Sequence, residues 1–204
     1  MNYFNKSNYT KYFSKKLIDY FTKDKVDLII KVARYKYKLL LRKIDKVSHK
    51  QRKHVYGCIL SLIAIYQSII EFNKIDAMKI VEETCKARAI SLSEKYNKLT
   101  KNKLLNKKFF IIFKKGFDMN FSSKCGFDFE LLSYDKNNNI KFNINGCPYV
   151  KYCKELKMKE LTHVFCLNDI YCYSQIEIID FKREHSLGID SNPCDFSFVR
   201  KENI

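Results

Sequence analysis

Hydrophobic positions recur with a helical period through about the first 120 residues. In the stretches 9–21 and 26–44, apolar residues return every three or four positions, and in the second stretch lysines fill the opposite face. The same period predicts a helix over 75–99. The stretch 104–117 fits either a helix or a strand, and we predict a helix. We therefore expect residues 1–120 to form a helical scaffold.

The stretch 52–72 is the most hydrophobic part of the chain. Its apolar residues cover a stripe so wide that we predict a central helix covered on most sides. The apolar run from Val55 to Ile70 is interrupted by glycine, serine and glutamine. It is too short and too polar to cross a bilayer comfortably, so we expect a buried helix and no membrane span.

Near Cys125 the hydrophobic period changes from helical to alternating. Apolar and polar residues alternate over 127–131 and again over 140–144, on either side of the polar stretch 135–139. Two such runs across a short polar loop predict a β-hairpin. Pro148 suits the first turn of a following helix.

A second helix is predicted over 159–171, and strands are predicted over 176–181 and 194–199. The fold class is therefore α+β, with a helical N-terminal half packed on a small antiparallel sheet in a ββααββ-like C-terminal half. A length of 204 residues fits a single domain, 1–204, with the scaffold at 1–120 and the α+β region at 121–204.

The net charge of +17 would suit binding to nucleic acid, to an anionic membrane or to an acidic partner. However, the basic residues are almost all lysines spread along the chain, whereas phosphate-binding proteins usually cluster them. We therefore do not predict nucleic-acid binding, although a charge-driven nucleic-acid or partner-binding protein stays an alternative. Exposed aromatic residues of the first helices would pack within the fold or cover the interface of a homodimer.

Eight cysteines are scattered along the chain, several of them inside helical patterns. The opening residues contain no continuous apolar segment of the kind that a secretory signal has. We expect a cytoplasmic protein with reduced cysteines.

The residues that could carry chemistry gather after position 146. Cys147 lies between a strand and a helix start, where unpaired amides and the helix dipole stabilise a thiolate, so it ranks first as a nucleophile. Cys166 and Asp169 are three residues apart and share a helix face. Arg183 and His185 alternate on a predicted strand and would point to one face, where they could capture a carboxylate and transfer a proton.

Other interpretations of these residues stay open. Each cysteine could be a packed core residue, and Arg183 could be a structural partner of a buried acid. No zinc-type CxxC spacing is present, so we predict no cofactor, although the scattered cysteines could assemble a metal site with His163 or His185. No phosphate loop, G-x-S-x-G or HExxH motif occurs in the sequence.

The last third of the chain resembles the L-2-amino-thiazoline-4-carboxylic acid hydrolase family. The order and spacing of the pieces are fairly specific. They are Phe127-Asp128-Phe129, Phe142-Asn143-Ile144, Cys147-Pro148-Tyr149, Glu160-Leu161, Phe165-Cys166-Leu167-Asn168-Asp169, Phe181-Lys182-Arg183, Leu187-Gly188 and Cys194-Asp195-Phe196-Ser197-Phe198.

This resemblance implies hydrolysis of a small cyclic amidine or thiazoline, with a C–N or C–S bond opened, in an amino-acid or specialised biosynthetic pathway. Cys147 would be the nucleophile, Asp169 or His185 the proton carrier and Arg183 the carboxylate anchor, with Cys166 also in the catalytic site. Tyr149 and Cys194 would contact the substrate.

The cysteine pattern is also similar, more distantly, to the vinyl-reductase-type ligand-binding domains related to TRAPP subunits. That likeness implies a sensory or small-ligand-binding domain without turnover, and this non-catalytic function is the alternative to a hydrolase.

Overall fold

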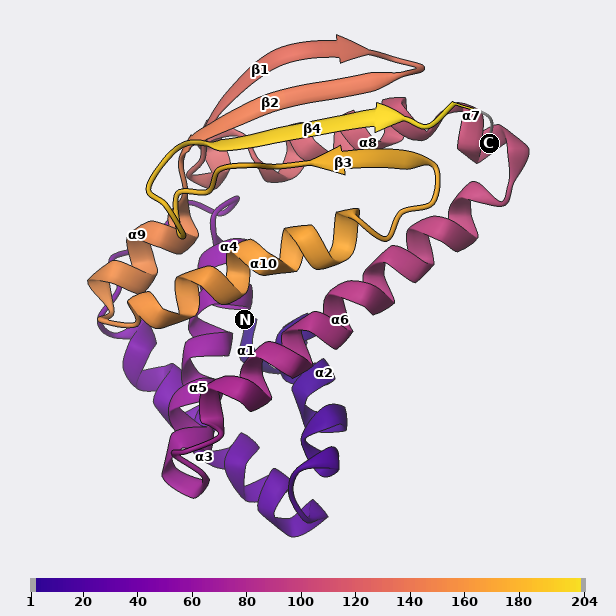
Figure 1. The fold of residues 1–204 in the computed structure, drawn as a ribbon. Helices are drawn as coiled ribbons and strands as arrows, with labels where there is room; N and C mark the ends of the chain where they lie inside the picture. Colours follow the sequence, from indigo (N-terminus) through magenta and orange to yellow (C-terminus); the bar gives the residue numbers. More distant parts are fainter. Residues whose placement is uncertain (1–2, 203–204) are drawn as a thin grey trace. The chain divides into compact units, whose positions relative to one another are not determined.

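The computed structural model describes residues 3–202 and has the element order that the periodicity predicts (Figure 1). Its elements are α1 (Tyr3–Lys6), α2 (Asn8–Lys16), η1 (Leu17–Asp19), α3 (Lys23–Leu41), α4 (Arg52–His54), η2 (Val55–Ile59), α5 (Leu60–Phe72), α6 (Ala77–Thr100), α7 (Lys103–Lys107), α8 (Phe109–Asn120), η3 (Ser123–Cys125), β1 (Asp128–Asp135), β2 (Asn139–Gly146), α9 (Pro148–Glu155), η4 (Lys159–Leu161), α10 (Thr162–Tyr173), β3 (Ile179–Lys182) and β4 (Cys194–Arg200). The predicted α+β class and the ββααββ order are confirmed.

The chain divides into two compact units. The first contains residues up to Cys85 together with 151–164, and the second contains 86–150 and 165 onward. The boundary between the units falls inside α6, and residues 151–164 of the C-terminal half belong to the first unit.

The first unit is built around α5, which packs along α3. Every residue of α5 from Leu60 to Tyr66 is buried, as a stripe of that width predicts. The hydroxyl of Ser68 donates a buried hydrogen bond of 2.7 Å to the carbonyl of Ile29, which satisfies this polar group within the core.

The helical stretch Arg52–Phe72 has 21 residues and a mean hydropathy of 1.7 in its most apolar window, so its length and composition would allow it to cross a membrane. The sequence suggested that this stretch is too short to span a membrane, but the length of the helix does not support that argument. However, 61% of that window is buried inside the protein, which is typical of the core helix of a soluble protein. The prediction of a buried helix is confirmed.

The second unit contains a four-stranded antiparallel sheet with the order β1-β2-β4-β3. The predicted hairpin is confirmed: β1 pairs with β2 through a turn in which the Asp135 side chain accepts the amides of Asn137 and Asn138. Gly126, at φ 91°, ends the η3 turn in the left-handed region just before β1, a conformation that glycine adopts without a Cβ clash.

One face of this sheet is covered by α8, seen running along the strands in Figure 1. The stretch 104–117 is helical as predicted, but it forms two helices, α7 and α8, that meet at Lys108. The aromatic core of the unit contains side chains from α8 and from the inward positions of β2 and β4. These are Phe109, Phe110, Phe113, Phe117, Phe127, Phe142, Phe196 and Phe198.

The strand predicted over 176–181 is shorter and later in the chain than expected. The observed β3 is Ile179–Lys182, and Ile176 and Ile178 are buried in the turn that leads into it. Arg183 and His185 therefore lie beyond the last residue of β3, and the prediction that they share one face of a strand is wrong.

Candidate active site

Three of the predicted cysteines lie close together in the second unit, and two of them contact a serine that the sequence did not single out. Cys194 opens β4, and its Sγ lies 3.9 Å from the Oγ of Ser186. Ser186 also hydrogen-bonds the Cys166 thiol, and both Cys166 and Cys194 act electrostatically on Cys147. We call Cys147, Cys166, Ser186 and Cys194 the cysteine–serine cluster.

Cys147 is the single residue between β2, which ends at Gly146, and α9, which begins at Pro148. As predicted, backbone amides at the helix start, those of Tyr149 and Val150, donate to its sulfur and favour the thiolate. Burial outweighs them and raises the pKa of the Cys147 thiol to about 12. The resting side chain is therefore a neutral thiol, and its proton must be removed during any attack.

The other two thiols of the cluster are also neutral at rest, because burial raises the pKa of each. Several groups oppose this shift for Cys194: the Leu187 amide, which donates to its sulfur at 3.4 Å, the Ser186 hydroxyl and the charge of Arg183. Cys166 and Cys194 are buried, whereas Cys147 is only partly buried. Taken as a whole residue, Cys147 is thus the least buried of the three, although its sulfur is enclosed enough for burial to raise its pKa to about 12.

Asp169 and Arg183 form an ion pair beside the cluster. The Nη1 atom of Arg183 lies 3.4 Å from the Oδ2 atom of Asp169 and donates a 3.1 Å hydrogen bond to the Cys166 carbonyl. Burial raises the pKa of Asp169 to about 6, although the charge of Arg183 opposes the shift. A carboxyl group with that pKa can both accept and return a proton near neutral pH.

The guanidinium of Arg183 is almost enclosed. Its side chain is 2% exposed and lies over the ring of Phe196 at 5.5 Å. These surroundings fit the alternative interpretation, in which Arg183 is a structural partner of a buried acid and not a substrate anchor. Arg183 also lines an open recess of about 250 Å³ at the end of β3, between Ile170 and Ser174 of α10 and the stretch 181–184.

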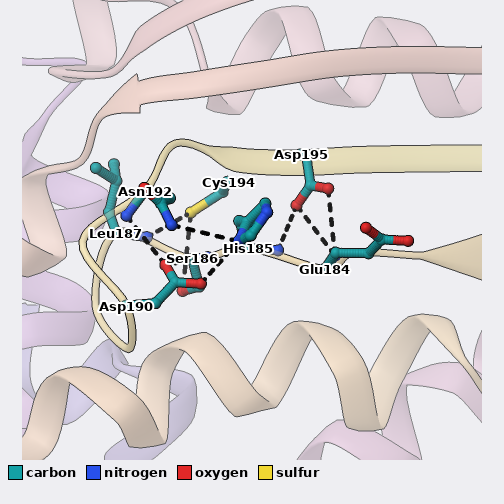
Figure 2. A network of polar contacts seen from close by, with 8 residues as sticks. All are labelled: Glu184, His185, Ser186, Leu187, Asp190, Asn192, Cys194 and Asp195. Carbon is teal, nitrogen blue, oxygen red and sulfur yellow. Dashed lines mark hydrogen bonds and ion pairs between the residues drawn. The ribbon is translucent and has the colours of Figure 1, made fainter.

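His185 lies in the loop that joins β3 to β4, where its ring contacts Asp190 and Asn192 of the same loop (Figure 2). It is exposed, and its Nδ1 atom lies 3.0 Å from the Oδ2 atom of Asp190. The hydrogen bond to Asp190 raises the pKa of His185, and the same contact is the first of several that lower the pKa of Asp190 to about 2. The structure thus does not bring His185 together with the cysteines.

The loop that carries Ser186 is held by two aspartates. The Asp195 carboxylate accepts the amides of Glu184 and His185, the latter at 2.6 Å, and Asp190 accepts the Ser186 amide at 3.0 Å (Figure 2). Because charged acceptors make strong bonds to amides, this network fixes the backbone on both sides of the Ser186 hydroxyl.

Tyr149, the predicted substrate contact, packs its ring 4.8 Å from that of Phe165 and remains half-buried.

A family model described as L-2-amino-thiazoline-4-carboxylic acid hydrolase matches residues 52–198. The chain belongs to this hydrolase family. The match begins well before the resemblance that the motifs revealed, because it includes the helix-rich stretch that starts at Arg52. No curated protein and no solved structure gives a significant match to the chain.

In this member of the hydrolase family, sequence reasoning missed Ser186, Asp190 and Asp195. A serine among polar loop residues has no pattern that would mark it, since its role depends on sulfur atoms from two other elements. The aspartates carried a weak signal, because Asp and Asn next to Ser are typical of side chains that accept backbone amides in turns. Within residues 3–202, no group of three or more His, Cys, Asp or Glu side chains is arranged to hold a metal ion.

Proposed function

We propose that this chain hydrolyses a small cyclic substrate of the amidine or thiazoline type, opening a C–N or C–S bond at the cysteine–serine cluster. The observation that carries the proposal is the proximity of Cys147 to Cys166 and Cys194, which both contact Ser186, next to the Asp169–Arg183 pair. The hydrolase description of the family supports the reaction class. The small recess beside Arg183 supports a small substrate.

The proposed reaction consumes one water molecule. The Cys147 sulfur attacks the ring carbon between sulfur and nitrogen, and the thiol proton is transferred to the Asp169 carboxylate. The bond from that carbon to the ring nitrogen breaks. The ring nitrogen leaves as a primary amine, with one proton returned by Asp169 and one proton from the exocyclic amino group, which becomes an imine on the carbon still bound to Cys147. Water then adds to this carbon, and one of its protons restores the amino group. The Cys147 sulfur leaves with the other proton as a thiol, and the water oxygen becomes the carbonyl oxygen of an S-carbamoyl product. A covalent route of this kind replaces one difficult step by two easier ones.

The remaining residues have supporting roles in this proposal. Asp169 is preferred to His185 as the proton carrier, because His185 is exposed and bonded to Asp190. Arg183 positions Asp169 and would meet the carboxylate of a substrate in the recess. Cys166 and Cys194, with Ser186, form the wall against which the substrate ring would lie.

Cysteine variants of the full chain test the proposal directly. We expect Cys147→Ala to lower the rate of ring opening of 2-amino-thiazoline-4-carboxylate by at least about 100-fold, because a covalent nucleophile is lost. Cys166→Ala and Cys194→Ala should cause smaller losses. The measurement is chromatography of substrate and ring-opened product. Cys125→Ala is the matched control, since Cys125 is buried in the same unit and its thiol donates to the carbonyl of Met119.

Full activity in all three cluster variants would exclude the cysteine mechanism. Binding of the thiazoline with no turnover by the unaltered chain would favour the ligand-binding alternative. If purified protein contained stoichiometric metal that chelation removed together with activity, the cysteines would be ligands and not nucleophiles.

The pH dependence of the same activity tests the role of Asp169. Because its pKa is raised to about 6, the carboxylate is the main form above that pH and is lost below it. We expect kcat/KM to fall about tenfold for each pH unit below about 6, as expected for a base that must be ionised. Asp169→Asn should be slow at every pH and lack this acidic limb. An acidic limb that persisted unchanged in Asp169→Asn would assign it to another group.

A further inference from the structure

The second unit carries a basic cavity that the proposed hydrolase site does not use. It has a volume of about 520 Å³ and lies where the end of α6, the short helix α7, the β1–β2 turn and the end of β4 meet. Four of its lining side chains are cationic. The eight lining residues are Thr100, Lys101, Lys103, Asn106, Lys107, Asn137, Asn138 and Arg200.

Arg200 is fixed in this cavity by neutral groups alone. Its Nε atom donates to the Asn137 carbonyl at 2.7 Å, Nη1 to the Asn106 side-chain oxygen at 2.8 Å, and Nη2 to the Asn106 carbonyl at 2.9 Å. Its guanidinium carbon also lies 5.3 Å from the ring centre of Phe110. Two of its five N–H groups are not used in these bonds.

The positive charge of the cavity has no acidic partner among the residues that the structure describes. Among residues 3–202, neither Arg200 nor Lys101, Lys103 or Lys107 makes an ion pair, and no carboxylate lines the cavity. Burial also lowers the pKa of Arg200, which shows that its charge is partly desolvated. A partly desolvated cation without an acidic partner is stabilised when an anion binds beside it.

We propose that this cavity binds a small phosphate-bearing molecule with at least two phosphoryl groups. Three exposed lysine ammonium groups around a fixed guanidinium can contact several phosphate oxygens at once. The amides of Asn137 and Asn138 add neutral donors and acceptors at the rim for the rest of the molecule. No aromatic residue lines the cavity, so it lacks the stacking surface on which single-stranded nucleic acid is usually held.

Titration of the full chain with inorganic pyrophosphate, followed by calorimetry, tests this site. We expect saturable binding of one pyrophosphate, weaker binding of monophosphate, and affinity that falls as salt is raised. The double variant Lys103→Gln/Lys107→Gln should weaken pyrophosphate binding at least about tenfold, because two of the four cations are lost. Both lysines are exposed, so the variant should fold normally.

The control is Lys95→Gln/Lys115→Gln, which removes the same charge from exposed positions of the same unit that do not line the cavity. Equal losses in the two double variants would show only a general effect of net charge and would overturn the proposal. Binding to vesicles containing a phosphoinositide or to an RNA oligomer, without binding of free pyrophosphate, would overturn it as well. Ring-opening activity is measured in parallel. Normal activity in the Lys103/Lys107 variant would show that this site is independent of the proposed hydrolase function.

Discussion

Replacing Phe198 with alanine is expected to lower the free energy of unfolding of the second unit by about 3–5 kcal/mol, the usual cost of removing a fully buried aromatic side chain. Phe198 is 0% exposed and lies on β4, which pairs with both β2 and β3. Its ring lies within about 6 Å of six other rings, those of Phe113, Phe117, Phe142, Tyr173, Phe181 and Phe196.

So many rings cannot all move to fill the space that Phe198 leaves, so a large part of the cavity would remain. The measurement is urea unfolding followed by circular dichroism, together with hydrogen exchange of the β2 and β4 amides. Val199→Ala is the control, because Val199 is the next residue on the same strand and is 38% exposed. A loss for Phe198→Ala no greater than that for Val199→Ala would show that the aromatic cluster is not the core of this unit.

Replacing Asp169 with alanine is expected to lower the free energy of unfolding by about 3 kcal/mol, near the lower end of what breaking a buried ion pair costs. The change leaves the guanidinium of Arg183, which is 2% exposed, without its charged partner. The expected loss lies at the lower end of that range because the Asp169 side chain is still 33% exposed. Urea unfolding measures the loss.

Asp180→Ala is the matched control, because it breaks the pair that Asp180 makes with Lys182 at 3.7 Å. Both side chains of that pair are more than half exposed. An exposed pair contributes less than about 1 kcal/mol. The double variant Asp169→Ala/Arg183→Met should recover much of the loss, since no charge is then left buried. If Asp169→Ala and Asp180→Ala were equally mild, Arg183 would not depend on its partner.

The pH dependence of stability at Asp169 runs opposite to that of an ordinary salt-bridged carboxylate. Burial raises its pKa to about 6 from the ordinary value of 3.8, so the folded protein binds this proton more tightly than the unfolded chain does. Between these values, lowering the pH therefore favours the folded state at this group. Protonation of Asp169 should accordingly lower activity below pH 6 without causing acid unfolding.

The sequence was sufficient to predict the parts of the fold that have a regular hydrophobic period or characteristic turn residues. The wide apolar stripe of α5, the hairpin with its Asp135 turn and the helix start at Pro148 follow from local periodicity and turn chemistry. These features need no knowledge of distant residues, because each is encoded within one or two neighbouring elements. The break at Lys108 and the short β3 were missed. The ends of a strand such as β3 depend on which partner strand is available for pairing.

For the site, the residue types of the candidate set came from the sequence, and their arrangement came only from the tertiary structure. The motif order identified Cys147, Cys166, Asp169, Arg183 and Cys194, all of which lie in the second unit. Whether His185 joins them could not be decided from strand alternation, because the strand ends at Lys182 and the loop network turns the imidazole toward Asp190.

The same division holds for charge and ionisation. A helix start after Cys147 correctly predicted backbone amides that favour a thiolate, yet the pKa of that thiol is raised. The evenly spread lysines gave no sign of the basic cavity around Arg200. Local sequence determines which groups are present and which elements carry them. Desolvation and the meeting of charges from distant segments depend on packing, and only the tertiary structure decides them.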